Sequence, residues 1–274
     1  MKKRIFSGAV IVLLLIAVII FNKIFPLALH IAISLTSLIC VFELAKAVGV
    51  SKKPILLFPS LIAAAIIPFS VFVEHGSLVV FSIYTLLMFL GLIAYHKDIE
   101  LHEFGMVYAM TILISSGLQT IILMRSLNDN HGIFYAMIPL LAAWGPDVGA
   151  YFVGVLFGKH KLCPEISPKK TVEGFFGGIL FGMIAMIVVG LYFKYIYYGG
   201  QKSADYLVLA IIGAGSALTS VIGDLSFSII KRKYGIKDFG TIIPGHGGIL
   251  DRFDSVIFTA PYVYLIVSMM PLVV

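Results

Sequence analysis

Nine long apolar runs, separated by short polar breaks, follow one another along almost the whole chain. A helix needs about 20 mostly apolar residues to cross the hydrocarbon of a bilayer. Within the hydrocarbon, its backbone N–H and C=O groups must form hydrogen bonds with each other, because no water is present. Because the breaks are short, no soluble domain fits between the runs. We expect an all-α, polytopic integral membrane bundle with spans at about 4–22, 26–46, 55–73, 77–95, 104–124, 133–158, 174–196, 205–230 and 255–273.

The basic residues fall unequally on the two sides that alternate breaks define. With the N-terminus inside, 16 of the 20 Lys and Arg residues lie on the inner side, and only Lys23, Arg125, Lys194 and Lys202 lie outside. Cytoplasmic loops of membrane proteins carry such an excess. The sequence therefore predicts a multi-pass protein of the cell membrane whose N-terminus and functional loops face the cytoplasm.

The predicted membrane domain comprises residues 1–274, and its two parts differ in composition. Up to about residue 130 the runs are mainly Leu, Ile, Val, Ala and Phe, which is typical of a helical scaffold. From about residue 131 charge and glycine increase, and there we expect the catalytic helices and loops. Glu43 is an exception in the first part. It either reaches the interface beside Lys46 and Lys52 or belongs to the site, since ionisable groups within spans are costly.

The sixth apolar run contains Trp144, Asp147 and Tyr151 at helical positions i, i+3 and i+7. These positions share one face, so we expect the acid to point into the bundle. Pro146 removes a backbone donor and can kink the helix, which leaves carbonyls for protein, water or a cation to satisfy. Asp147 is then either a site residue or a single paired acid beside a kink.

The break after the sixth run places Lys169 and Lys170 beside a predicted helix start. Ser167 is expected at the N-cap and Pro168 at the first helical position. Free backbone N–H groups and two ammonium groups at a helix N-terminus favour a bound phosphate. The alternative is that these lysines are ordinary inner-side charge.

One face of the eighth run carries a polar residue at every fourth position: Ser216, Ser220, Asp224 and Ser228. Such a stripe must face protein or water inside a membrane. It continues into the basic residues 231–233. A carboxylate beside hydroxyl groups at this depth indicates a site for a hard cation.

Residues 237–254 combine glycines, His246 and carboxylates ahead of the last run. Glycines allow backbone N–H groups to turn towards an anion, and His246 can donate to a phosphate oxygen. Asp251 and Asp254 are three apart at a helix start and share a face. Carboxylates beside phosphate-binding groups favour Mg²⁺, which bridges one or two carboxylates to substrate phosphates. A glycine-rich turn with surface charge is the alternative.

These motifs together resemble the phosphatidate cytidylyltransferases, also called CDP-diacylglycerol synthases, over about residues 140–256. Phe227 departs from the family pattern, because many members have Glu there, and the change removes a carboxylate from the rim of the expected site. The resemblance is carried by Trp144, Asp147, Ala150, Tyr151 and Gly154, by Ser167, Pro168, Lys169, Lys170, Thr171, Glu173 and Gly174, and by Ser228, Lys231, Arg232, Lys237, Asp238, Pro244, His246, Gly247, Gly248, Asp251, Arg252 and Asp254.

The resemblance implies attack of a phosphatidic acid phosphate oxygen on the α-phosphorus of CTP, which gives CDP-diacylglycerol and pyrophosphate. The implied partners are CTP, phosphatidic acid and the lipid bilayer, without nucleic acid, and a homodimer stays open. The implied cofactor is Mg²⁺, and a second, monovalent cation also stays open. Catalytic roles are expected for Asp147, Asp224, His246, Asp251 and Asp254, with Asp224 and Asp251 as metal ligands. Substrate binding is expected for Ser167, Lys169, Lys170, Ser228, Lys231, Arg232, Lys237, Asp238, Gly247, Gly248 and Arg252.

Two other functions stay open from the sequence. The first is the same transfer to another lipid phosphate. The second is cation-coupled transport, in which Asp147, Asp224 and the helix break at Pro146 would line a path. Transport predicts movement of a substrate without consumption of a nucleotide.

Overall fold

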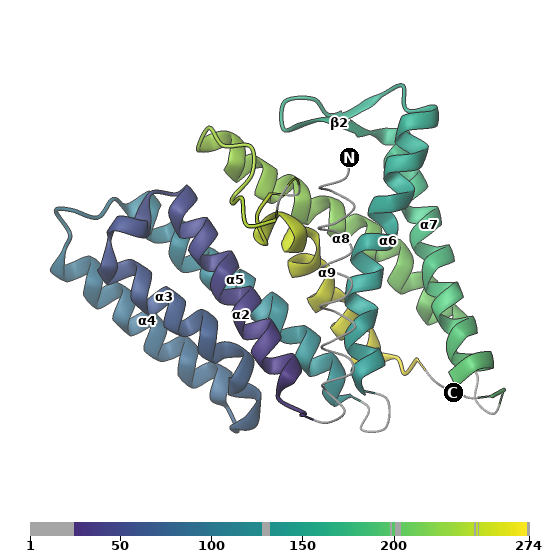
Figure 1. Cartoon of the computed structure of the whole chain (residues 1–274), viewed down its shortest axis with the longest axis horizontal. Helices are drawn as coiled ribbons and strands as arrows, with labels where there is room; N and C mark the ends of the chain where they lie inside the picture. The colour runs from purple at the N-terminus through teal and green to yellow at the C-terminus, as the bar shows by residue number, and fades with distance from the viewer. Residues whose placement is uncertain are drawn as a thin grey trace. The chain divides into compact units, whose positions relative to one another are not determined.

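The computed structural model describes residues 25–127, 132–197, 199–200, 204–243, 245 and 247–272, and most of them are helical (Figure 1). Each of the eight apolar runs predicted in this part of the chain forms a helix whose ends lie close to the predicted ends. The helices are α2 (Ala28–Ala47), α3 (Pro54–Ile66) with its 3-10 continuation η2 (Ile67–Phe72), α4 (Gly76–Ala94), α5 (Leu101–Ser126), α6 (Gly132–Phe157), α7 (Val172–Tyr192), α8 (Tyr206–Lys233) and α9 (Leu250–Met269).

Seven helical segments among the described residues are long and apolar enough to cross a membrane. The chain is therefore a polytopic, helical integral membrane protein. Helix α9 is not one of the seven, and its first turns carry Asp251, Arg252 and Asp254. The predicted span at 4–22 lies outside the described residues, so the total of nine spans stays a prediction.

The chain divides into two compact units that do not follow its order. The first unit comprises the described residues of Met1–Leu123 together with Lys231–Phe253. Within it, α2 packs on α3 and α3 packs on α4 (Figure 1). Polar side chains inside this unit pair with each other, as when Ser37 Oγ donates to Ser115 Oγ at 3.0 Å. Such pairing removes the cost of placing a hydroxyl group in a membrane interior.

The second unit comprises the described residues of Met124–Ile230 and Asp254–Val274. Helix α6 packs along α7, and glycines let their backbones approach closely. A Cβ atom on Gly174 would lie 2.8 Å from the carbonyl oxygen of Ala150, and one on Gly178 would lie 3.1 Å from that of Pro146. Small residues at a contact are the usual means by which membrane helices pack tightly.

A two-stranded hairpin connects α6 to α7, formed by β1 (Lys161–Cys163) and β2 (Ser167–Thr171). The strands are antiparallel, with Lys161 opposite Thr171 and Cys163 opposite Ser167. The expected N-cap at Ser167 is therefore wrong. Thr171 caps α7 instead, because its hydroxyl oxygen accepts from the N–H of Gly174 at 3.1 Å. Pairing with β1 keeps residues 167–171 extended, and a β-branched residue such as Thr171 fits a strand end.

Candidate active site

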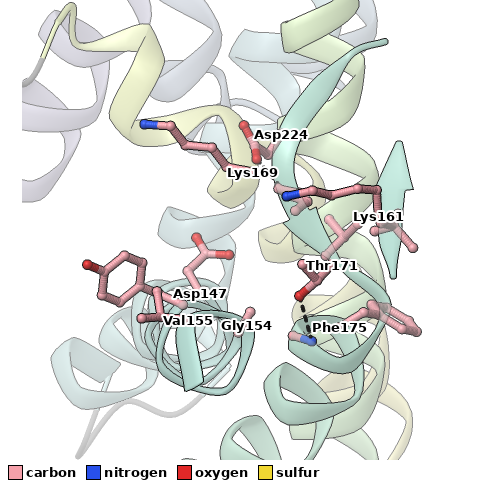
Figure 2. A pocket seen from close by; sticks show the side chains of 14 residues that line it. Asp147, Gly154, Val155, Lys161, Lys169, Thr171, Phe175 and Asp224 are labelled. Atoms are coloured by element: carbon pink, nitrogen blue, oxygen red, sulfur yellow. Dashed lines mark hydrogen bonds and ion pairs between the residues drawn. The ribbon is translucent and has the colours of Figure 1, made fainter. Parts of the chain in front are cut away.

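A cavity of about 480 Å³ is lined by residues of α6, α7, α8 and the hairpin, all within the second unit (Figure 2). Its apolar lining includes Val155, Leu162, Phe175 and Val221. Its charged lining consists of Asp147, Lys161, Lys169, Lys170 and Asp224. The cavity therefore offers ammonium groups for anions, carboxylates for a cation and apolar surface for a lipid.

Asp147 reaches this cavity from α6, one residue after Pro146. Ser220 of α8 donates its Oγ hydrogen to Asp147 Oδ1 at 2.7 Å. Ser220 is fully buried, as the polar stripe predicts. Tyr151, predicted on the same face as Asp147, lines the same cavity. This placement favours a site residue over a single acid beside a kink.

Asp224 of α8 forms an ion pair with Lys170 of β2, with 2.5 Å between Oδ2 and Nζ. Ser228 lies one turn further along α8, and its Oγ is 3.5 Å from Asp224 Oδ1. The side chains of Asp224 and Lys170 are 29% and 23% exposed, and both line the cavity. The carboxylate thus holds a cationic partner at a place that a substrate can reach.

The base of the hairpin is tied to the start of α7. His160 Nδ1 lies 2.7 Å from Glu173 Oε1, and the backbone N–H of His160 donates to both carboxylate oxygens at 3.2 Å. Together with the Thr171 cap, this contact fixes the point at which β2 enters α7. It thereby sets the position from which Lys169 extends (Figure 2). Lys170, the next residue of β2, lines the same cavity.

Asp251 lies in the first unit, at the start of α9, and its surroundings differ. Its side chain is 2% exposed, and Oδ1 pairs with Lys231 Nζ at 2.9 Å. Oδ2 accepts from the backbone N–H groups of Phe239 at 2.8 Å and Gly248 at 2.9 Å. The Lys231 ammonium also lies 5.4 Å from the centre of the Phe239 ring. Both oxygens of this predicted metal ligand are therefore engaged by protein donors.

Hydrogen bonds at the C-terminal end of α8 fix the backbone of Lys231. The N–H of Ile236 donates to the carbonyl of Lys231 at 2.9 Å, and the N–H of Gly235 donates to that of Arg232 at 3.2 Å. Gly235 has φ +65°, the left-handed conformation that completes this C-terminal motif. The chain therefore turns sharply after Lys233 and leads into the loop that returns to Asp251.

The remaining predicted residues are placed as follows. Arg232, Lys237, Asp238 and Arg252 have exposed side chains in the first unit. Asp254 is buried at the start of the second unit's part of α9, and its Oδ1 accepts from the N–H of Ser255 at 2.8 Å. Gly247 has φ +84°, and a Cβ atom there would lie 2.9 Å from Asp251 Oδ2. Pro244 and His246 lie outside the described residues.

The sequence matches the model of the cytidylyltransferase family over residues 2–270. This chain belongs to the cytidylyltransferase family. It is similar to the phosphatidate cytidylyltransferase of Bacillus subtilis (strain 168), with 32% identity over 280 aligned residues that cover 98% of each chain. Proteins of the same name from Staphylococcus saprophyticus and Staphylococcus epidermidis are 45% and 42% identical over 132 residues, which is 48% of each chain.

Two further residues of this cytidylyltransferase, Phe227 and Glu43, are buried in the structure. Phe227 is fully buried and packs edge-on against Phe258, with 6.4 Å between ring centres. The expectation that it stands at the rim of the site is wrong, because its side chain is buried against Phe258 and does not line the cavity. Glu43 is 3% exposed, so its carboxylate is covered by protein rather than reaching solvent. It accepts from the N–H of Leu250 at 2.8 Å.

The described residues contain no cluster of three side chains that would by itself define a metal site. No group of three or more His, Cys, Asp or Glu residues there is arranged to hold an ion. Asp147 and Asp224 line one cavity in the second unit, whereas Asp251 belongs to the first. The assignment of Asp224 and Asp251 as metal ligands stays a prediction.

Proposed function

We propose that this chain transfers the cytidylyl group of CTP to phosphatidate and releases pyrophosphate. The observation that carries the proposal is the match to a phosphatidate cytidylyltransferase over 98% of both chains. The cavity supports it independently, because three lysines and two carboxylates adjoin apolar lining. Transport is disfavoured by the names of the relatives, since none of those given above is called a transporter.

The reaction joins two anions, so the protein must neutralise charge and align the reacting groups. A phosphate oxygen of phosphatidate attacks the α-phosphorus of CTP, and the bond to the pyrophosphate oxygen breaks. No general base is needed, because the lipid phosphate is ionised near neutral pH. Lys161, Lys169 and Lys170 are placed to hold phosphate oxygens in the cavity. Val155 and Phe175 offer apolar surface to the lipid.

The donors in the cavity fit Mg²⁺, which prefers carboxylate oxygens and keeps several waters. In this structure the ammonium group of Lys170 lies against Asp224, so a positive charge already stands beside this carboxylate. We propose Asp224 as a ligand of the ion, and we keep Asp251 as a proposed catalytic residue on the family resemblance alone. When bound, Mg²⁺ would polarise phosphate oxygens and offset their charge. The cavity lysines and the Asp224 carboxylate are what this chain itself contributes.

A label in CTP tests the reaction directly. Purified protein in detergent, with phosphatidate and Mg²⁺, should move label from the α-phosphate of CTP into lipid and release one pyrophosphate per lipid product. Label in the γ-phosphate should appear only in pyrophosphate. Entry of γ-label into lipid would instead identify a lipid kinase. Folded protein that forms no CDP-lipid from any lipid phosphate would refute the proposal, and chelation of divalent ions should stop the reaction.

The proposed orientation places the hairpin and the loops in the cytoplasm. The chain contains two cysteines, of which Cys40 is buried and Cys163 lies partly exposed in β1. A membrane-impermeant maleimide should therefore label Cys163 in inverted vesicles and not in intact cells. If intact cells are labelled and this labelling disappears in Cys163→Ser, the proposed orientation is wrong.

A further inference from the structure

The start of α9 is held by a residue from a distant part of the chain. Glu43 Oε2 accepts from the N–H of Leu250 at 2.8 Å, and Oε1 accepts from the N–H of Ile249 at 3.2 Å. These N–H groups belong to the first turn of a helix, where no intrahelical acceptor exists. All residues involved belong to the first unit.

The amides of residues 248–250 are divided between two carboxylates. Gly248 donates to Asp251, whereas Ile249 and Leu250 donate to Glu43. Because neighbouring peptide groups share a Cα atom, the orientation of one constrains the next. The grip of Glu43 on Ile249 therefore helps to aim the Gly248 amide at Asp251.

The loop is also fitted closely around the Glu43 side chain. A Cβ atom on Gly240 or on Gly248 would collide with its carboxylate oxygens. Phe239, the neighbour of Gly240, supplies the second backbone N–H to Asp251. Both chain segments that donate to Asp251 are thus packed against Glu43.

We infer that Glu43 is a positioning residue for Asp251, acting through the backbone of residues 239–240 and 248–250. The inference rests on the proposed function, in which Asp251 takes part in the reaction. Glu43 does not touch the substrate. It fixes the direction of the Asp251 carboxylate and closes the N-terminus of α9, so that its first amides face protein carboxylates rather than an incoming phosphate.

Glu43→Gln tests this inference, because an amide keeps the size of the side chain but presents one acceptor and one donor. One of the Ile249 and Leu250 N–H groups then faces an NH₂ group. We expect kcat to fall about tenfold or more, since an unsatisfied buried donor is costly. KM for CTP should stay close to the wild-type value. Hydrogen–deuterium exchange should increase at residues 248–250 and stay unchanged in α2, α3 and α4. Glu74→Gln, at a side chain that is 91% exposed, serves as the control.

A second variant keeps the test decisive if Glu43→Gln does not fold. Gly240→Ala retains the carboxylate but displaces it, so kcat and local exchange should change in the same way. In a Glu43→Ala background the added methyl group should have much less effect, because its collision partner is absent.

Wild-type kcat in folded Glu43→Gln would overturn the inference. So would increased exchange in every helix, which indicates a general structural role. Inactive wild-type protein would instead contradict the proposed function, and the exchange measurement would still report on Glu43.

Discussion

The two lysine–aspartate pairs of this protein are chemically alike but differ in how freely they can change partners. Asp224 pairs with Lys170 at the wall of a cavity, and its side chain is 29% exposed. Asp251 pairs with Lys231, is 2% exposed and also accepts two backbone N–H groups. The first pair can release its ammonium group to a phosphate without leaving a buried charge. The second is part of the framework that shapes its loop.

This contrast shows that resemblance to a family motif does not assign equal roles to its carboxylates. An exposed pair contributes little to stability, because water and salt compete with it. Removal of one partner from a buried pair is costly, because the other charge is left without compensation. Stability and activity should therefore respond differently to substitution at the two sites.

The largest effect is expected for Asp251→Asn. The substitution leaves the Lys231 ammonium buried with a neutral partner, and it weakens the acceptor for Phe239 and Gly248. We expect loss of activity together with a decrease in unfolding free energy of about 3 kcal/mol. Thermal unfolding in detergent and the labelled-CTP assay measure the two effects. An unchanged unfolding free energy would show that the Lys231–Asp251 pair contributes as little to stability as the Lys170–Asp224 pair.

Asp224→Asn should abolish activity while the protein stays folded. The Lys170 ammonium is partly exposed and can be solvated, so the unfolding free energy should change by about 1 kcal/mol or less. Measured beside Asp251→Asn, this variant separates a carboxylate that serves the reaction alone from one that also stabilises the fold. A loss of unfolding free energy equal to that of Asp251→Asn would contradict the proposed difference between the two pairs.

Lys170→Met should lower activity less than either aspartate variant, because other lysines also line the cavity. We expect a decrease in kcat of about tenfold, as for one charged contact to a phosphate. Lys169→Met should have a smaller effect, since no ion pair ties Lys169 to Asp224 among the described contacts. Lys159→Met, outside the cavity lining, is the control. Equal loss in all three variants would indicate a general effect of charge.

The smallest effect is expected for Thr171→Val, which removes the cap of α7 and retains the side-chain shape. Loss of an N-cap costs about 1 kcal/mol. The unfolding temperature should fall slightly, and KM should rise because the hairpin carrying Lys170 is less well fixed. Thr171→Ser, which keeps the hydroxyl group, should behave like the wild type. A wild-type melting temperature in Thr171→Val would show that the pairing of β1 and β2 suffices.

The parts of the fold that follow one strong local signal could be predicted from the sequence. Hydropathy identified the helices from α2 to α9, because the cost of exposed backbone in lipid leaves few alternatives. The four-residue spacing identified the stripe on α8, and Ser220 is buried at its expected place. Asp147 was found because a carboxylate next to a proline is conspicuous within an apolar run.

The features that were missed depend on partners far along the chain. Ser167 looked like a helix cap because a local Ser-Pro pattern was considered without β1, which pairs with it. Phe227 was placed at the rim because its neighbour Ser228 belongs to the stripe, although Phe258 of α9 covers it. The role of Glu43 could not be assigned from its own surroundings in the sequence. The two N–H groups that donate to its carboxylate belong to residues 206 and 207 positions further along the chain.

That separation also matters for the biosynthesis of the protein. Glu43 enters the membrane early in synthesis, whereas Ile249 and Leu250 are made near the end of the chain. Contacts of such long sequence separation form late in folding, because the chain between them must first be ordered. A nascent or truncated chain therefore contains a membrane-embedded carboxylate without its final partners. Only a chain completed through the start of α9 can supply the two N–H groups from which Glu43 accepts.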